Sequence, residues 1–181
     1  MSMGQITALV LAAVLVFWML GAYNRLVHLR MAIVTAWARC EAPLQQRSSS
    51  TAALVTALGE ALQSEAATLQ AVSAALAQLD EAARALKASP VSAEAAAGFS
   101  VAMVALDAGL ARLTSLCEHA GGLQADPDVA AALAGLRESQ PALAFGRQLF
   151  NTTVQAYNAA LDEFPTRLLV GLYRFGAAGR I

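Results

Sequence analysis

The first part of the chain is apolar at nearly every position, so that a helix formed there would be apolar on all sides. The rest of the chain is apolar at regular intervals, so that its helices would be apolar on one side. Residues 6–22 read ITALVLAAVLVFWMLGA, and no charged side chain precedes Arg25. About 20 consecutive apolar residues are enough to cross the hydrocarbon core of a bilayer. We therefore predict a transmembrane anchor over residues 1–24. Its membrane-spanning side chains are Ile6, Leu9, Leu11, Leu15, Phe17, Trp18 and Leu20.

The alternative for this segment is a cleaved signal peptide. A signal peptide carries basic residues before its apolar core and a small-residue cleavage site after it. No lysine or arginine precedes residues 6–22, and the helical pattern continues beyond them, so we favour a retained anchor. The arginines that follow favour a cytoplasmic body with the N-terminus outside, and a periplasmic body is the alternative. These arginines are Arg25, Arg30, Arg39 and Arg47.

Beyond residue 24, apolar residues recur alternately three and four positions apart, which is typical of helices that pack along a seam. The pattern predicts four helices, at about 25–47, 52–88, 92–119 and 126–164. The breaks fall at SSST (48–51), Ser89-Pro90 and AGGLQADP (120–127), where hydroxyl, proline and glycine residues favour turns. The predicted fold is all-α, with the transmembrane helix continuous with an antiparallel four-helix bundle over residues 25–164.

The helix lengths leave one point open. The helix over 52–88 is too long to end level with the one over 25–47, so it reaches the bilayer surface or breaks, for example near Gly59.

The clearest seams belong to the third and fourth predicted helices. In the third, the seam residues are Phe99, Met103, Leu106, Leu110, Leu113 and Cys117. In the fourth, they are Val129, Leu133, Leu136, Gln140, Leu143, Arg147, Phe150, Val154, Tyr157, Leu161 and Phe164. Gln140 and Arg147 are polar at seam positions, where such residues commonly fix the register or the oligomeric state. We favour this structural interpretation over a ligand-binding one.

Residues 165–181 combine arginines with large apolar side chains, a pattern that suits the headgroup region of a membrane. We predict a short amphipathic, interfacial helix there, and a short capping helix folded onto the bundle is the alternative. The membrane-interface candidates are Arg25, Arg30, Arg167, Leu168, Leu172, Tyr173, Arg174 and Phe175.

Composition narrows the functional classes. The chain is 57% hydrophobic and 14% charged, with a net charge of −1, which does not favour nucleic-acid binding. So few charges leave helix faces that are suited to meet lipid or protein. His28 and His119 are the two histidines, and Cys40 and Cys117 fall on seam positions. Because zinc needs four convergent ligands, Cys117 and His119 are too few for a metal site, and we expect no metal. The sequence has no acidic cluster, no GxSxG motif and no phosphate-binding glycine loop, so we expect no cofactor and no catalytic residue.

The residues at both ends resemble the LemA family. YNRLVHLR follows the predicted span, and LAFGRQLFNTTVQAYNAALDEFPTRLLVGLYRFG closes the chain. The positions that match the family's motifs include Tyr23, Asn24, Trp37, Arg147, Asn151, Tyr157, Asn158, Phe164 and Pro165. Family charges are missing at QRSSSTA (46–52) and at ESQPA (138–142), which marks a divergent member.

The resemblance implies a bacterial membrane-anchored helical bundle without an established catalytic activity, linked to membrane organisation and to membrane proteases. We accordingly expect a non-enzymatic, single-pass protein of the inner membrane that acts as a homo-oligomeric scaffold. The alternative is an accessory subunit that docks on a membrane protease or another membrane complex.

Overall fold

The computed structural model describes residues 3–59, 61–119, 122–164, 166–167 and 175–181. Within these residues the chain forms four α-helices and two short 3₁₀ helices, and no strand. The α-helices are α1 (Met3–Leu58), α2 (Ala66–Ala88), α3 (Ala93–His119) and α4 (Pro127–Asp162), and the 3₁₀ helices are η1 (Gln63–Glu65) and η2 (Leu123–Ala125). The prediction of an all-helical fold with a long apolar helix at its N-terminus is confirmed.

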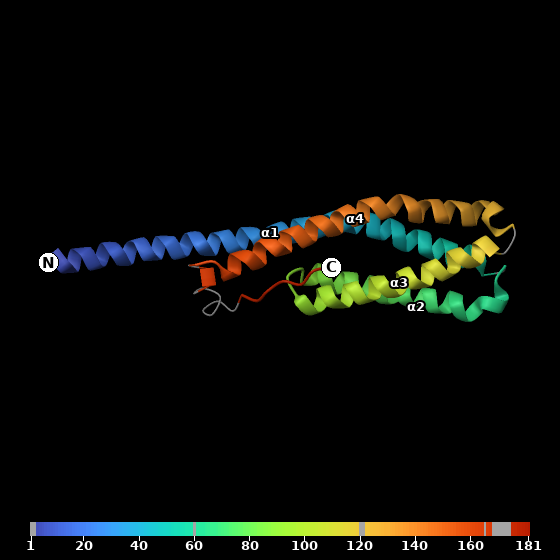
Figure 1. The fold of residues 1–181 in the computed structure, drawn as a ribbon, viewed down its shortest axis with the longest axis horizontal. Helices are drawn as coiled ribbons and strands as arrows, with labels where there is room; N and C mark the ends of the chain where they lie inside the picture. Colours follow the sequence, from blue (N-terminus) through green and yellow to red (C-terminus); the bar gives the residue numbers. More distant parts are fainter. Residues whose placement is uncertain (1–2, 60, 120–121, 165, 168–174) are drawn as a thin grey trace.

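The helices pack in two pairs. α1 and α4 lie side by side and run in opposite directions, and α2 and α3 form the second pair against α1 (Figure 1). The first third of α1 projects beyond both pairs. Asp126 caps the start of α4, because its side chain accepts hydrogen bonds from the backbone N–H groups of Asp128 and Val129. Pro127 follows at the first helical position, as predicted.

The predicted turn at 48–51 is wrong, because α1 continues through it to Leu58. The hydroxyl groups that suggested a cap are used inside the helix instead: Thr51 Oγ1 donates to the Arg47 carbonyl and Ser48 Oγ donates to Asp80. Ser50 also meets α4 so closely that a Cβ on Gly135 would lie 2.3 Å from its hydroxyl oxygen. Small residues are therefore needed here for packing, and the chain turns at Gly59 instead.

The seam predictions account for most of the core. All six predicted residues of α3 are buried, and so are Phe150, Val154, Tyr157 and Leu161 of α4. Trp37 of α1 packs edge-to-face against Phe99 and Phe150, with ring centroids 5.3 and 6.2 Å away. Each such buried aromatic side chain contributes about 1.5–3 kcal/mol to stability. These three rings tie α1, α3 and α4 together.

The seam of α4 differs from the prediction at two positions. Phe164 is 70% exposed, because α4 ends at Asp162. Gln140 is also exposed, although its neighbour in the sequence, Ser139, is buried.

The described part of the C-terminal segment is not helical over residues 175–181. It is an irregular, extended segment that returns along the body, with Ala178 and Ile181 buried. Nearer to α4 in the sequence, Thr166 is buried and Arg167 is exposed. The predicted helix over the intervening positions lies outside the described residues. For residues 175–181 neither predicted helix is present, although this segment does pack onto the body, as the capping alternative expected.

Candidate functional site

The projecting part of α1 is apolar and uncovered. None of its residues from Met3 to Gly21 is buried, and an 18-residue window within it has a mean hydropathy of 2.3. The seven side chains predicted to lie in a membrane are 44–74% exposed. At about 1.5 Å per residue, residues 3–21 extend for about 28 Å, which is close to the thickness of a bilayer core. This part of α1 has the length and composition of a membrane span.

Helix α3 also meets the length and hydropathy criteria for a span, with a mean hydropathy of 1.4. However, 39% of its apolar window is buried inside the protein. Its buried side contacts the rest of the body through the seam residues given above. The hydropathy of α3 is therefore accounted for by core packing.

Aromatic and charged side chains from both ends of the chain meet where α1 leaves the body. The ring centroids of Trp18 and Phe164 lie 4.9 Å apart, and those of Tyr23 and Phe175 lie 6.1 Å apart. Arg25 forms an exposed ion pair with Glu163. Tryptophan, tyrosine and basic residues are enriched at membrane–water interfaces. The side chains expected at an interface thus gather at one level of the molecule.

The interface candidates differ in their surroundings. Arg30 places its guanidinium carbon 5.5 Å from the ring centroid of Phe175, which is half-buried. Phe175 thus packs against α1 through Tyr23 and Arg30. Arg167 is exposed, as is the motif residue Asn24. The remaining candidates and one motif residue lie outside the described residues: Pro165, Leu168, Leu172, Tyr173 and Arg174.

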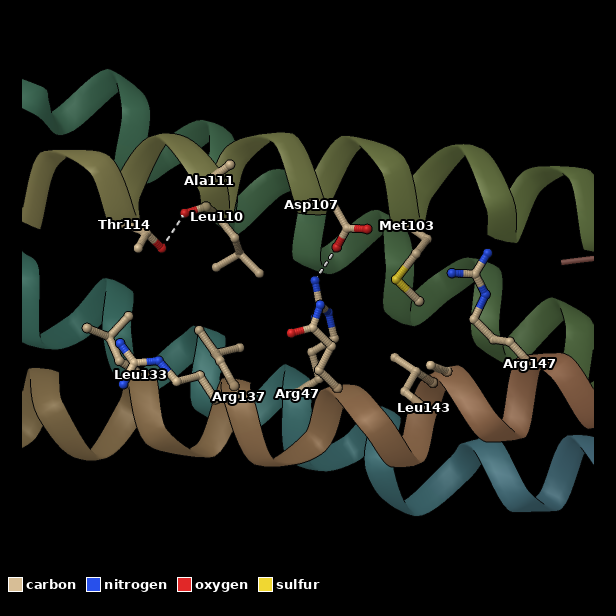
Figure 2. Close-up of a pocket in the computed structure, with 13 residues that line it drawn as sticks. Arg47, Met103, Asp107, Leu110, Ala111, Thr114, Leu133, Arg137, Leu143 and Arg147 are labelled. Carbon is tan, nitrogen blue, oxygen red and sulfur yellow. Dashed lines mark hydrogen bonds and ion pairs between the residues drawn. The ribbon is translucent and has the colours of Figure 1, made fainter. Parts of the chain in front are cut away.

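Farther from the projecting end, a cavity of about 470 Å³ lies between α3 and α4 (Figure 2). Arg47 of α1 reaches into it and forms an ion pair with Asp107 of α3. Arg137 and Arg147 of α4 also line the cavity, but of these three arginines only Arg47 pairs with Asp107. The buried Nε atoms of Arg47 and Arg147 have no hydrogen-bond partner among the described residues. The lining of the cavity therefore contains more basic than acidic side chains.

Arg147 also affects the cysteine in the core. Burial raises the pKa of the Cys40 thiol to about 11, although the positive charge of Arg147 opposes this change. Burial likewise raises the pKa of Cys117. Both thiols are free and buried, and neither has the lowered pKa of a reactive cysteine. His119 is exposed, with its Nδ1 2.7 Å from the Ser115 carbonyl oxygen. Among the described residues, no group of three potential metal ligands occurs.

The polar motif residues of α4 contact the C-terminal segment. Asn158 bonds to the backbone of Ala178, and Asn151 bonds to the backbone of Ile181. The Tyr157 hydroxyl donates to the carbonyl oxygen of Gly176 at 3.2 Å. The seven-residue spacing of the two asparagines was visible in the sequence. The segment that they bind carries no periodic signal, so its contacts with the two asparagines could not be predicted from the sequence.

Comparison with the curated proteins gives no significant match. In contrast, the model of the LemA family matches residues 36–179, which include α2, α3, α4 and residues 36–58 of α1. The match also includes the motif residues at the C-terminal end of α4. The chain therefore belongs to the LemA family.

Proposed function

We propose that this protein is a non-enzymatic, single-pass membrane protein whose four helices form an antiparallel bundle continuous with the membrane helix. The observation that supports the anchor is the stretch from Met3 to Gly21, which is apolar, helical and without a buried residue. Exposing this much apolar surface to water is unfavourable, and a bilayer removes that cost. The membrane is the bacterial inner membrane, as is typical of the family that the sequence resembles.

The arginines after the span support a cytoplasmic body with the N-terminus outside. Arg25, Arg30, Arg39 and Arg47 follow the apolar stretch, and no basic side chain precedes it. Labelling of a single cysteine at Ser2 in intact cells tests this orientation, in a background with Cys40 and Cys117 replaced by alanine. An impermeant thiol reagent should label this cysteine without permeabilisation. Labelling only after permeabilisation would reverse the orientation.

The body is proposed to act as a homo-oligomeric scaffold. An exposed apolar stripe continues from the span along α1, at Leu20, Tyr23, Val27, Met31 and Val34, with exposures of 37–58%. These positions are three and four residues apart, so they lie on one side of the helix. A stripe of this kind is suited to contact the same stripe of another copy.

The mass of the full-length protein in mild detergent tests the scaffold. We expect a discrete assembly that becomes smaller when residues 1–22 are removed or when Met31 is changed to Glu. Ala53→Glu is the matched control, because Ala53 is an exposed position of the same helix outside the stripe. A monomeric full-length protein across concentrations would overturn the scaffold.

A second candidate function is that of an accessory subunit on a membrane protease or another membrane complex. Val101 and Val104 of α3 and Phe145 of α4 favour it, because these large apolar side chains on the body are 65–71% exposed. Purification from native membranes distinguishes the two functions. A stoichiometric partner that is lost on Phe145→Lys would support the accessory subunit, and a pure homo-oligomer would support the scaffold.

A further inference from the structure

The contact between α4 and the C-terminal segment consists of two paired amide interactions. Asn158 donates from Nδ2 to the Ala178 carbonyl oxygen at 2.9 Å and accepts at Oδ1 from the Ala178 N–H at 2.8 Å. Asn151 makes the same two bonds with Ile181, at 2.5 and 2.8 Å. Each asparagine thus binds both backbone groups of one residue. Such pairs recognise an extended backbone whatever its side chains.

The spacing of the two pairs fits an extended ligand. Asn151 and Asn158 are seven residues apart, so they lie on one side of α4 and about 10.5 Å apart along its axis. Ala178 and Ile181 are three residues apart, which is about 10 Å in an extended chain. Two turns of helix therefore match three residues of extended peptide. A helical segment of the same length would reach less than half as far.

The side chains of the segment add selectivity. Ala178 and Ile181 are buried, whereas Ala177 and Arg180 are exposed. Gly179 lies against α3, where an added Cβ would be 2.7 Å from the Ala93 Cα and from the Ala96 Cβ. A side chain at this position would push the segment away from the groove. The groove thus fits a sequence of the type Ala-Gly-x-Ile.

We propose that this groove of α4 and α3 is a binding site for an extended peptide, and that it takes residues 175–181 of a second copy as well as those of its own chain. Every bond from the asparagines goes to backbone atoms, so the same segment offered by a neighbouring copy satisfies the groove equally. This inference rests on the proposed membrane anchoring, which holds two copies in one plane with their grooves at the same height. Exchange of the segment would then link neighbouring bodies.

Two full-length variants in nanodiscs test the exchange. Gly179→Val has an intact groove and a segment that does not fit, while Asn151→Ala/Asn158→Ala has an intact segment and a defective groove. With donor and acceptor dyes on the two variants, we expect energy transfer when they are mixed. The matched control is the same mixture with Gly179→Val added to the double variant, so that no fitting segment remains. The other helix faces are the same in both mixtures. Association through those faces therefore contributes equally to the energy transfer in each.

A synthetic peptide of residues 175–181 provides an independent measurement. It should bind the Gly179→Val protein, and Asn158→Ala added to that protein should weaken binding by about tenfold. The same peptide with valine in place of its glycine should not bind. If Gly179→Val fails to fold by circular dichroism, Ile181→Asp empties the groove in its place.

Two outcomes would overturn the proposal. Equal energy transfer in the test and control mixtures would exclude a second copy as the occupant, even if the peptide binds. Absence of peptide binding to a folded protein with an emptied groove would exclude the binding site. Both outcomes are separate from failure of the anchor, which would appear as loss of the protein from membranes.

Discussion

The two parts of α1 form one continuous helix but have opposite surroundings. From Met3 to Gly21 no residue is buried, whereas from Ala22 to Leu58 buried or half-buried residues recur every three or four positions. The first part is apolar all round. The second has an apolar side that packs against α4 and α2, and the exposed stripe described above follows another side as far as Val34. The comparison teaches that the period of the apolar residues, and not their number, determines whether a helix suits a protein core.

The largest effect is expected from a charge in the core of the second part. Phe150 packs on Trp37 of α1 and is fully buried, so Phe150→Asp should cost several kcal/mol and unfold the body. Phe145→Asp is the matched control, because Phe145 lies on the same helix but is 65% exposed. Circular dichroism and thermal melting measure both variants. Retention of the wild-type melting temperature in Phe150→Asp would show that the core is misassigned.

A charge in the first part should leave the body folded and affect the membrane instead. Leu15→Arg places a guanidinium near the middle of the apolar stretch, at a cost of about 2.5–3.5 kcal/mol for insertion. We expect less protein to float with vesicles, with an unchanged thermal melt. Ala53→Arg, in the second part of α1, should change neither quantity. Full flotation of Leu15→Arg would argue against the span.

The second part should also make stability depend on pH. An unfolded Cys40 thiol loses its proton near pH 9, whereas the folded thiol loses it near 11. The unfolded state therefore binds fewer protons between these values, and stability falls as the pH rises from 9 to 11, by about 2–3 kcal/mol. Burial also raises the pKa of Tyr157, which adds to the loss at higher pH. The free energy of unfolding, measured by denaturant melts across this pH range, should depend less steeply on pH in Cys40→Ala. An unchanged dependence on pH would contradict the assignment.

The smallest effect is expected at the junction of the two parts. The Arg25–Glu163 pair is about half-exposed on both sides, so Glu163→Gln should cost at most about 1 kcal/mol. This difference should disappear in high salt, because exposed charges are screened. A loss that persists in high salt would mean that Glu163 acts through the end of α4 and not through the ion pair.

Much of the fold could be predicted because the seams of α3 and α4 follow a regular period. The turn at 48–51 could not, because a serine can cap a helix or bond within it, and the choice depends on what packs opposite. Here Gly135 leaves room for Ser50, and Asp80 accepts from Ser48. These partners are 85 and 32 residues away along the chain, so local sequence does not reveal them.

The candidate site was predictable to a smaller extent. The apolar span stands out because its residues are apolar almost without interruption. Asn151 and Asn158 stand out because they are two helical turns apart. Gly179 does not stand out in the sequence, because its role depends on the close approach of α3 at Ala93 and Ala96. The three arginines of the cavity also come from helices that the fold brings together.

The continuity of α1 has a mechanical consequence. α1 contains two residues that weaken a helix, Gly21 at the junction and Pro43 within the body. Contacts to Phe164 and Glu163 hold the helix on both sides of Gly21, at Trp18 and Arg25. If the span lies in a bilayer as proposed, a tilt of the span also tilts the body, because both belong to one continuous helix. The arm from Ala22 to Leu58 is about 54 Å long, so a typical tilt of about 20° would displace its far end sideways by about 18 Å. The thickness of the membrane would then set the angle at which each body meets its neighbours.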